Sequence, residues 1–98
     1  MKNFRTYQIA VEFYHRTAAE KLPGHLKDQL LRAASSVVLN LAEGAGRFSA
    51  KDQKRFFHIA FGSLRECQAV LDLGGKAKPE LKEIADKLAA HLFKLIRS

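Results

Sequence analysis

The side chains that most often carry out catalysis or bind metal ions are few and widely spaced in this chain. No two of His15, His25, His58 and His91 are three or four residues apart, the spacing that places two ligands on one face of a helix. Cys67 is the single cysteine, which excludes an internal disulfide bond and a zinc site built from several cysteines. No glycine-rich loop of the phosphate-binding type is present. We therefore expect no catalytic residue, no metal site and no cofactor, and we predict that the protein is not an enzyme.

Basic residues are the stronger functional signal. The 98-residue chain has 17 Lys and Arg against 10 Asp and Glu, a net charge of +7. Such a balance favours an acidic partner, with nucleic acid first among the candidates. In an antiparallel bundle of four helices, one end would hold most of the excess charge, with only Glu43 and Asp52 as acids. We predict that the bases at this end bind phosphates: Lys2, Arg5, Arg47, Lys51, Lys54, Arg55, Lys94 and Arg97. The alternative is an ordinary solvated surface.

Phe48 stands in the middle of this basic sequence and has two interpretations. It could stack on an exposed base, as aromatic side chains do in proteins that bind single strands. It could instead pack against the start of the next helix, which Ser49 can cap with Asp52 three residues on, as in a capping box. The position directly before the cap favours packing, as in a hydrophobic staple.

The elements that must position these residues are helices. Apolar residues recur at three- and four-residue steps in four segments, and strand alternation is absent. The segments are about residues 3–21, about residues 25–44, a third that starts at the Ser49 cap and ends at Gly74, and a fourth that starts at Pro79. Three short connections make an all-α, antiparallel up-down four-helix bundle the simplest arrangement. We expect one domain over residues 1–98.

The second helix is apolar nearly all round. Between Leu30 and Ala42 only Arg32, Ser35, Ser36 and Asn40 are polar. A helix of this kind must be covered on more than one side, which a 98-residue bundle can hardly achieve alone. We therefore predict that this helix forms an oligomer interface. The alternative is a central core helix in a monomer.

Several polar residues lie on or beside the faces expected to be apolar: Gln29, Asn40, Glu43, Ser63 and Glu66. Buried polar groups need partners. The second and third helices each carry a pair three residues apart, so the pairs could form a hydrogen-bonded layer with Arg47 or Arg32. We interpret this set as a structural network that sets helix register. The alternative is a carboxylate pair that binds a metal, which the lack of a paired histidine disfavours.

The sequence contains no secretory or membrane-spanning segment. Its first eight residues, MKNFRTYQ, include no apolar run. No stretch of about 18 apolar residues occurs anywhere. We expect a cytoplasmic protein that does not contact a membrane.

The chain resembles a known family over roughly residues 4–75. The run SSVVLNLAEG at residues 35–44, followed by Arg47 and Ser49 and then by GSLRE at 62–66, is similar to the four-helix-bundle proteins encoded in intervening sequences of bacterial 23S ribosomal RNA genes. That family is similar in fold to the accessory variability determinant of diversity-generating retroelements. The resemblance implies a homopentamer of bundles and, from the retroelement relatives, binding of nucleic acid and of a reverse transcriptase. It implies no catalytic residue.

Two functional hypotheses follow. The first is a non-enzymatic, oligomeric accessory protein that binds structured RNA or an RNA/DNA partner through its basic end. The second is a protein-interaction scaffold in which the basic charge is incidental.

Overall fold

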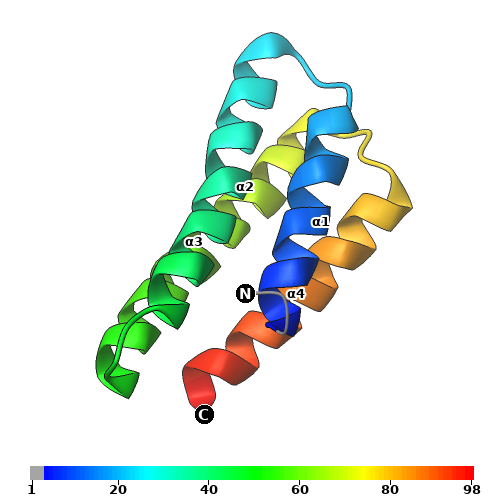
Figure 1. The fold of residues 1–98 in the computed structure, drawn as a ribbon. Coiled ribbons are helices and arrows are strands. Elements are labelled where there is room, and N and C mark those ends of the chain that lie inside the picture. Colours follow the sequence, from blue (N-terminus) through cyan, green and yellow to red (C-terminus); the bar gives the residue numbers. More distant parts are fainter. Residues whose placement is uncertain (1–3) are drawn as a thin grey trace.

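The computed structural model describes residues 4–98 and consists of four helices joined by short loops (Figure 1). They are α1 (Arg5–Ala19), α2 (Gly24–Ala45), α3 (Ala50–Gly74) and α4 (Pro79–Arg97). No strand occurs within residues 4–98. The helix boundaries follow local chemistry: Pro23 precedes the first turn of α2, Ser49 caps α3, and Pro79 begins α4. The predicted all-α fold is confirmed.

The helices pack in the order of the chain around one core. α1 packs beside α2 and α4, and α3 packs beside α2 and α4. The contact between α2 and α3 is the most extensive. The bundle measures 40 × 21 × 21 Å. This is the predicted antiparallel up-down bundle, with the α2–α3 hairpin extending as a separate tip beside the C-terminal end of α4 (Figure 1).

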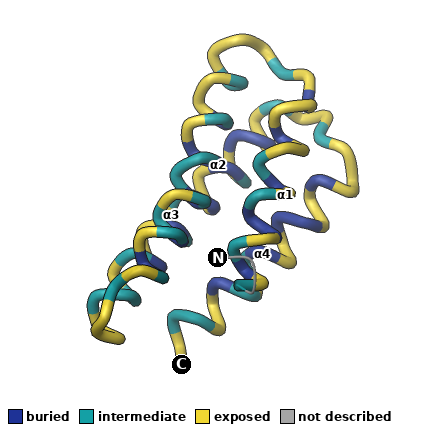
Figure 2. The backbone as a smooth tube through the Cα atoms, viewed as in Figure 1, coloured by how far each residue is buried: buried dark blue, intermediate teal, exposed yellow. Residues whose placement is uncertain are grey.

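The core is a continuous line of aliphatic and aromatic side chains, and each helix turns one buried face toward it (Figure 2). Phe13, Leu30, Leu64 and Leu88 supply one completely buried side chain per helix. Cys67 lies on the same buried face of α3, as its place in the apolar pattern predicts. Burial of such side chains is the main source of stability for a bundle of this size.

α2 is covered on two sides, by α1 and by α3. This accounts for much of its apolar sequence: Leu30, Val37 and Leu41 are completely buried. Leu39 is the exception, since 65% of it remains exposed. The oligomer interface stays a prediction, and Leu39 is the large apolar side chain of α2 that this single bundle leaves exposed.

The end of the bundle opposite the predicted basic end is held by hydrogen bonds between its two loops. The Lys27 ammonium donates to the carbonyls of Ala18 and Glu20. The Glu20 carboxylate in turn accepts the backbone N–H of Lys78 at 3.3 Å. These contacts tie the α1–α2 connection to the α3–α4 connection. No helix within residues 4–98 has the length and apolar character needed to cross a membrane.

Candidate nucleic-acid interface

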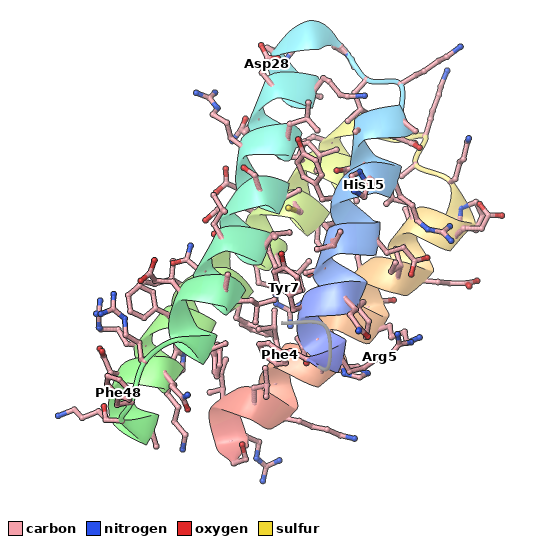
Figure 3. The ribbon with its side chains drawn as sticks, viewed as in Figure 1. Phe4, Arg5, Tyr7, His15, Asp28 and Phe48 are labelled. Carbon is pink, nitrogen blue, oxygen red and sulfur yellow. The ribbon has the colours of Figure 1, made fainter. Side chains whose placement is uncertain are left out.

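The predicted basic residues divide into two groups at one end of the bundle. Arg47, Lys51, Lys54 and Arg55 lie at the tip formed by the end of α2 and the start of α3, together with Phe48 (Figure 3). Arg5, Lys94 and Arg97 lie at the start of α1 and the end of α4, where Figure 3 labels Arg5. Lys2 lies outside the described residues. The predicted single cluster is thus two neighbouring groups, because the α2–α3 hairpin diverges from α4.

At the tip, two arginines are already paired with carboxylates. Arg47 Nη2 lies 2.9 Å from Glu43 Oε2, and Arg47 Nε lies 3.7 Å from Asp52 Oδ2. Arg55 Nη2 lies 3.1 Å from Asp52 Oδ1. Within the described residues, neither Lys51 nor Lys54 has such a partner. The two lysines are therefore the tip cations most available to an external phosphate.

The cap of α3 is only half of the predicted capping box. Ser49 Oγ accepts the backbone N–H of Asp52 at 3.1 Å, as expected of an N-cap. The Asp52 carboxylate does not return to Ser49 and binds Arg55 and Arg47 instead. A nearby arginine offers a carboxylate a stronger, charge-assisted bond than a backbone N–H. The predicted reciprocal bond is therefore replaced by an ion pair.

Two aromatic residues at the tip behave in opposite ways. The Phe56 ring lies between two guanidinium groups, with Arg47 Cζ 4.7 Å and Arg55 Cζ 4.3 Å from its centroid. Phe48 is fully exposed. The expectation that Phe48 packs as a hydrophobic staple is therefore wrong. The residue on which a staple would pack is Gln53, a polar side chain whose Nε2 donates to the Arg47 carbonyl at 3.0 Å.

A shallow hollow lies along the first turns of α3. It is lined by residues that share positive or neutral polar character, with Asp52 as the one acid: Ser49, Lys51, Asp52, Lys54, Arg55 and His58. Lysine and arginine beside backbone N–H groups at a helix start form an environment that favours a phosphate. This hollow is the best candidate phosphate position at the tip.

The second basic group is larger than the sequence analysis predicts. Lys87, His91 and Lys94 occupy one face of α4 at four- and three-residue steps, and Arg5 approaches them from α1. Partial burial of the imidazole, and then repulsion from Lys87, Arg5 and Lys94, lower the pKa of His91 below 6.5. Lys87 and His91 were missed, although their helical spacing with Lys94 was a signal. Arg97 lies apart from them over the Phe93 ring, at 5.3 Å.

The predicted polar network exists in part, on the outer seam between α2 and α3. Ser36 and Ser63 share a hydrogen bond of 2.8 Å between their hydroxyls, and Asn40 Nδ2 donates to the Ser36 carbonyl and hydroxyl at 2.9 and 3.1 Å. Gln29 Nε2 donates to Glu66 Oε2 at 3.4 Å, so this second link is long.

None of the five predicted network members is fully buried, and Asn40 and Ser63 are half-buried. Gln29, Glu43 and Glu66 are exposed, and Glu43 pairs with Arg47 at the tip and joins no layer. Ser36, which is not among the predicted members, makes a shorter link from α2 to α3 than Gln29 does. Within the described residues no group of three potential metal ligands exists.

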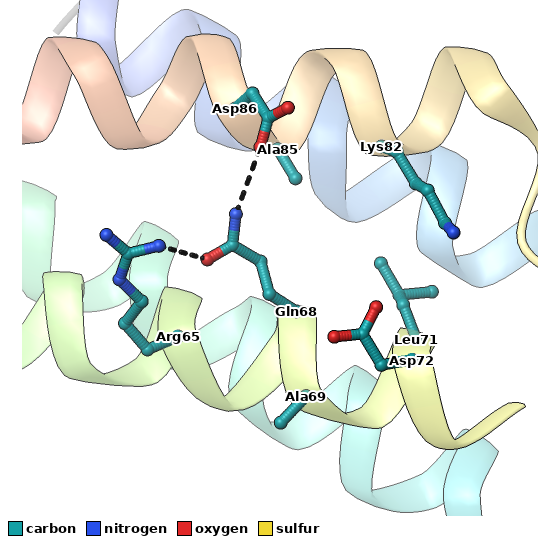
Figure 4. A pocket seen from close by; sticks show the side chains of 8 residues that line it. All are labelled: Arg65, Gln68, Ala69, Leu71, Asp72, Lys82, Ala85 and Asp86. Atoms are coloured by element: carbon teal, nitrogen blue, oxygen red, sulfur yellow. Dashed lines mark hydrogen bonds between the residues drawn. The ribbon is translucent and has the colours of Figure 1, made fainter. Parts of the chain in front are cut away.

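A further hollow, between α3 and α4, is lined by side chains of both charges (Figure 4). Gln68 links the helices there, since it accepts from Arg65 Nη1 at 2.8 Å and donates to Asp86 Oδ1 at 3.3 Å. Asp72 and Lys82 face the same space. Such opposed charges largely satisfy one another, so this hollow is a weaker candidate for an anionic ligand than the tip.

Fold and surface together define a small four-helix-bundle protein with basic groups concentrated at one end. The family model described as 23S rRNA-intervening sequence protein matches residues 2–98. Because this match covers nearly the whole chain, the protein belongs to the 23S rRNA-intervening sequence protein family. No curated protein matches the sequence.

Proposed function

We propose that the protein is a non-enzymatic, cytoplasmic accessory factor that binds structured RNA, or an RNA/DNA partner, through its basic end. The observation that carries the proposal is the pair Lys51 and Lys54 beside the hollow at the start of α3, two cations that have no carboxylate partner among residues 4–98. Arg5 and Lys94 at the same end, with Lys87 near the middle of α4, supply further phosphate contacts. Ionic contacts with phosphates release counterions, so the affinity is expected to fall steeply with salt.

The test is the fluorescence anisotropy of a labelled RNA hairpin titrated at about 50 and 200 mM salt, a range over which phosphate contacts weaken strongly. The double variant Lys51→Glu/Lys54→Glu is expected to weaken binding and to lower the salt dependence by about one unit of log–log slope per lysine removed. Arg55 is left unchanged in this variant because Arg55→Glu would face Asp52 and disturb the cap.

The matched control is Lys21→Glu/Lys76→Glu, which makes the same change in net charge in exposed loops at the opposite end of the bundle. It is expected to retain most of the affinity. Equal affinity of the tip variant and the wild-type protein would refute the proposal, as would the absence of wild-type binding at the lower salt. Helicity by circular dichroism should be the same in all variants.

We further propose that the chain works as a homo-oligomer, most simply the homopentamer that the sequence resemblance implies. Support comes from an apolar hollow between α1 and α2, lined by Val11, Tyr14, Ser35, Val38 and Leu39. Light scattering after size-exclusion chromatography is expected to give five times the 11.0 kDa chain mass. Leu39→Glu should produce the monomer, because it places a charge on this surface. A monomeric wild-type protein would overturn the assignment.

The second candidate function is a scaffold for another protein, such as a reverse transcriptase, which would occupy the same apolar hollow. It predicts a specific partner that stays bound to the tagged protein after nuclease treatment. Loss of that partner with Leu39→Glu, together with no effect of Lys51→Glu/Lys54→Glu on function, would favour the scaffold over the nucleic-acid role.

A further inference from the structure

Phe48 is an aromatic residue whose ring the fold leaves without a partner. It is fully exposed at the outer end of the tip (Figure 3), and among residues 4–98 neither a guanidinium nor another ring lies over it. The six other phenylalanines all have partners. Phe13 and Phe57 are buried, Phe4 packs on Phe57 at 6.2 Å, and guanidinium groups cover the remaining three: Phe56, Phe61 and Phe93.

The backbone that carries Phe48 is held on both sides, although the ring itself is free. The N–H of Arg47 donates to the Gly44 carbonyl at 3.1 Å, and the Arg47 carbonyl accepts Gln53 Nε2 at 3.0 Å. On the other side, Ser49 is the N-cap of α3. The ring is therefore presented from a four-residue loop, residues 46–49, whose backbone is held in place, and this limits the conformational entropy that binding would remove.

The groups beside the ring are cations, which are suited to bind the phosphate of a nucleotide. Arg47 directly precedes Phe48, and Lys51 and Lys54 follow within the first two turns of α3. An aromatic ring for the base and nearby cations for the phosphates are the two components with which proteins bind single-stranded nucleic acids. An apolar protein-docking surface would instead surround Phe48 with apolar residues, whereas Arg47 and Ser49, which flank it in the chain, are charged and polar.

We infer that Phe48 is a stacking platform for an unpaired base, so that the tip selects single-stranded or looped nucleotides over continuous duplex. This inference rests on the proposed nucleic-acid role and specifies its substrate class. In a duplex, each base face is already stacked on its neighbours, so a side chain at the tip reaches only phosphates and sugars. In a loop or single strand the base can turn outward onto the ring.

The test compares two labelled probes of equal length, a single-stranded RNA and a blunt RNA duplex. A single-stranded DNA is the third probe, and it shows whether binding depends on ribose or accepts deoxyribose. The wild-type protein is expected to prefer the single strands. Phe48→Ala is expected to lose roughly five- to a hundredfold in affinity for them, the fold-change that corresponds to one stacked base. Its affinity for the duplex, and the salt dependence of binding, should stay unchanged because no ionic contact is removed.

Two further variants separate stacking from general effects. Phe48→Tyr keeps an aromatic face and should retain the single-strand affinity. Leu73→Ala removes another exposed apolar side chain, 74% exposed and far along α3, and should change nothing. Equal losses on single strand and duplex, or no loss with Phe48→Ala, would overturn the inference while leaving the nucleic-acid role intact. A change in oligomer mass with Phe48→Ala would also overturn the inference, because it would show that Phe48 contacts another copy of the chain. No binding of the wild-type protein to any probe would refute the nucleic-acid role itself.

Discussion

The close approach of α2 and α3 at the tip depends on Gly44, and its replacement by alanine tests the packing described above. Gly44 is buried in the last turn of α2. A Cβ at this position would lie 2.7 Å from Phe57 Cε1 and 3.0 Å from both Phe57 Cδ1 and Phe56 Cβ. Neither aromatic residue can yield easily, because Phe57 packs on Phe4 and the Phe56 ring lies between Arg47 and Arg55.

Two opposing contributions determine the effect of Gly44→Ala. Overpacking of a tight contact typically costs about 1–3 kcal/mol, and the better helix propensity of alanine returns at most about 1 kcal/mol. The net loss should be about 1–2 kcal/mol. For a domain of this size, such a loss corresponds to a fall in Tm of about 5–15 °C. The assay is thermal unfolding followed by circular dichroism at low protein concentration.

Gly62→Ala is the matched control, since it makes the same chemical change in the middle of α3. Nothing lies within 4 Å of a Cβ at Gly62. This variant should be more stable than the wild-type protein by about 0.5–1 kcal/mol, through helix propensity alone. If Gly44→Ala is as stable as the wild-type protein, the close packing of α2 on α3 is refuted. If Gly62→Ala is destabilised in a concentration-dependent way, another copy of the chain covers this face.

Three further predictions concern single side chains. The pKa of His91 is below 6.5 in the folded chain, so the unfolded chain binds this proton more readily and stability should fall as the pH is lowered through 6.5. The difference between the urea unfolding midpoints at pH 5 and pH 8 should therefore be smaller in His91→Gln than in the wild-type protein. Burial, and then repulsion from the neighbouring carboxylate, raise the pKa of Cys67 to about 12, so its thiol should react with Ellman's reagent at pH 8 only after unfolding, and rapid native labelling would contradict this burial. Ser36→Ala removes the bond to Ser63 and should cost about 1 kcal/mol in urea unfolding, whereas Ser35→Ala, whose hydroxyl bonds only within α2, should cost less; equal losses would show that the link between helices contributes nothing.

The helices were predictable because their signals are local. Each signal depends only on residues a few positions away along the chain. These signals are the apolar repeats, the helix end at Gly74 and Gly75, and the helix starts at Ser49 and Pro79. Gly75 takes a φ of 74°, the left-handed conformation that a glycine after a helix predicts. The up-down order followed from the short connections.

The candidate interface was only partly predictable. The basic residues of the tip are adjacent in the sequence, so their grouping needed no tertiary information. The meeting of Arg5 with Lys87, His91 and Lys94 needed the packing of α1 on α4. Glu43 pairs with Arg47, one of the two arginines expected to join the layer, but the pair is exposed because it lies at the end of α2.

What the sequence by itself determined is the identity of the elements: four amphipathic helices, one apolar core and an excess of positive charge. Only the tertiary structure decided which charges are neutralised and which aromatic ring is free. Ion pairing and ring coverage depend on distances of a few ångström between side chains, and those distances are set by how α2 and α3 meet. Phe48 and Phe56 are equally aromatic in the sequence. The fold places guanidinium groups over Phe56 and leaves Phe48 exposed to solvent.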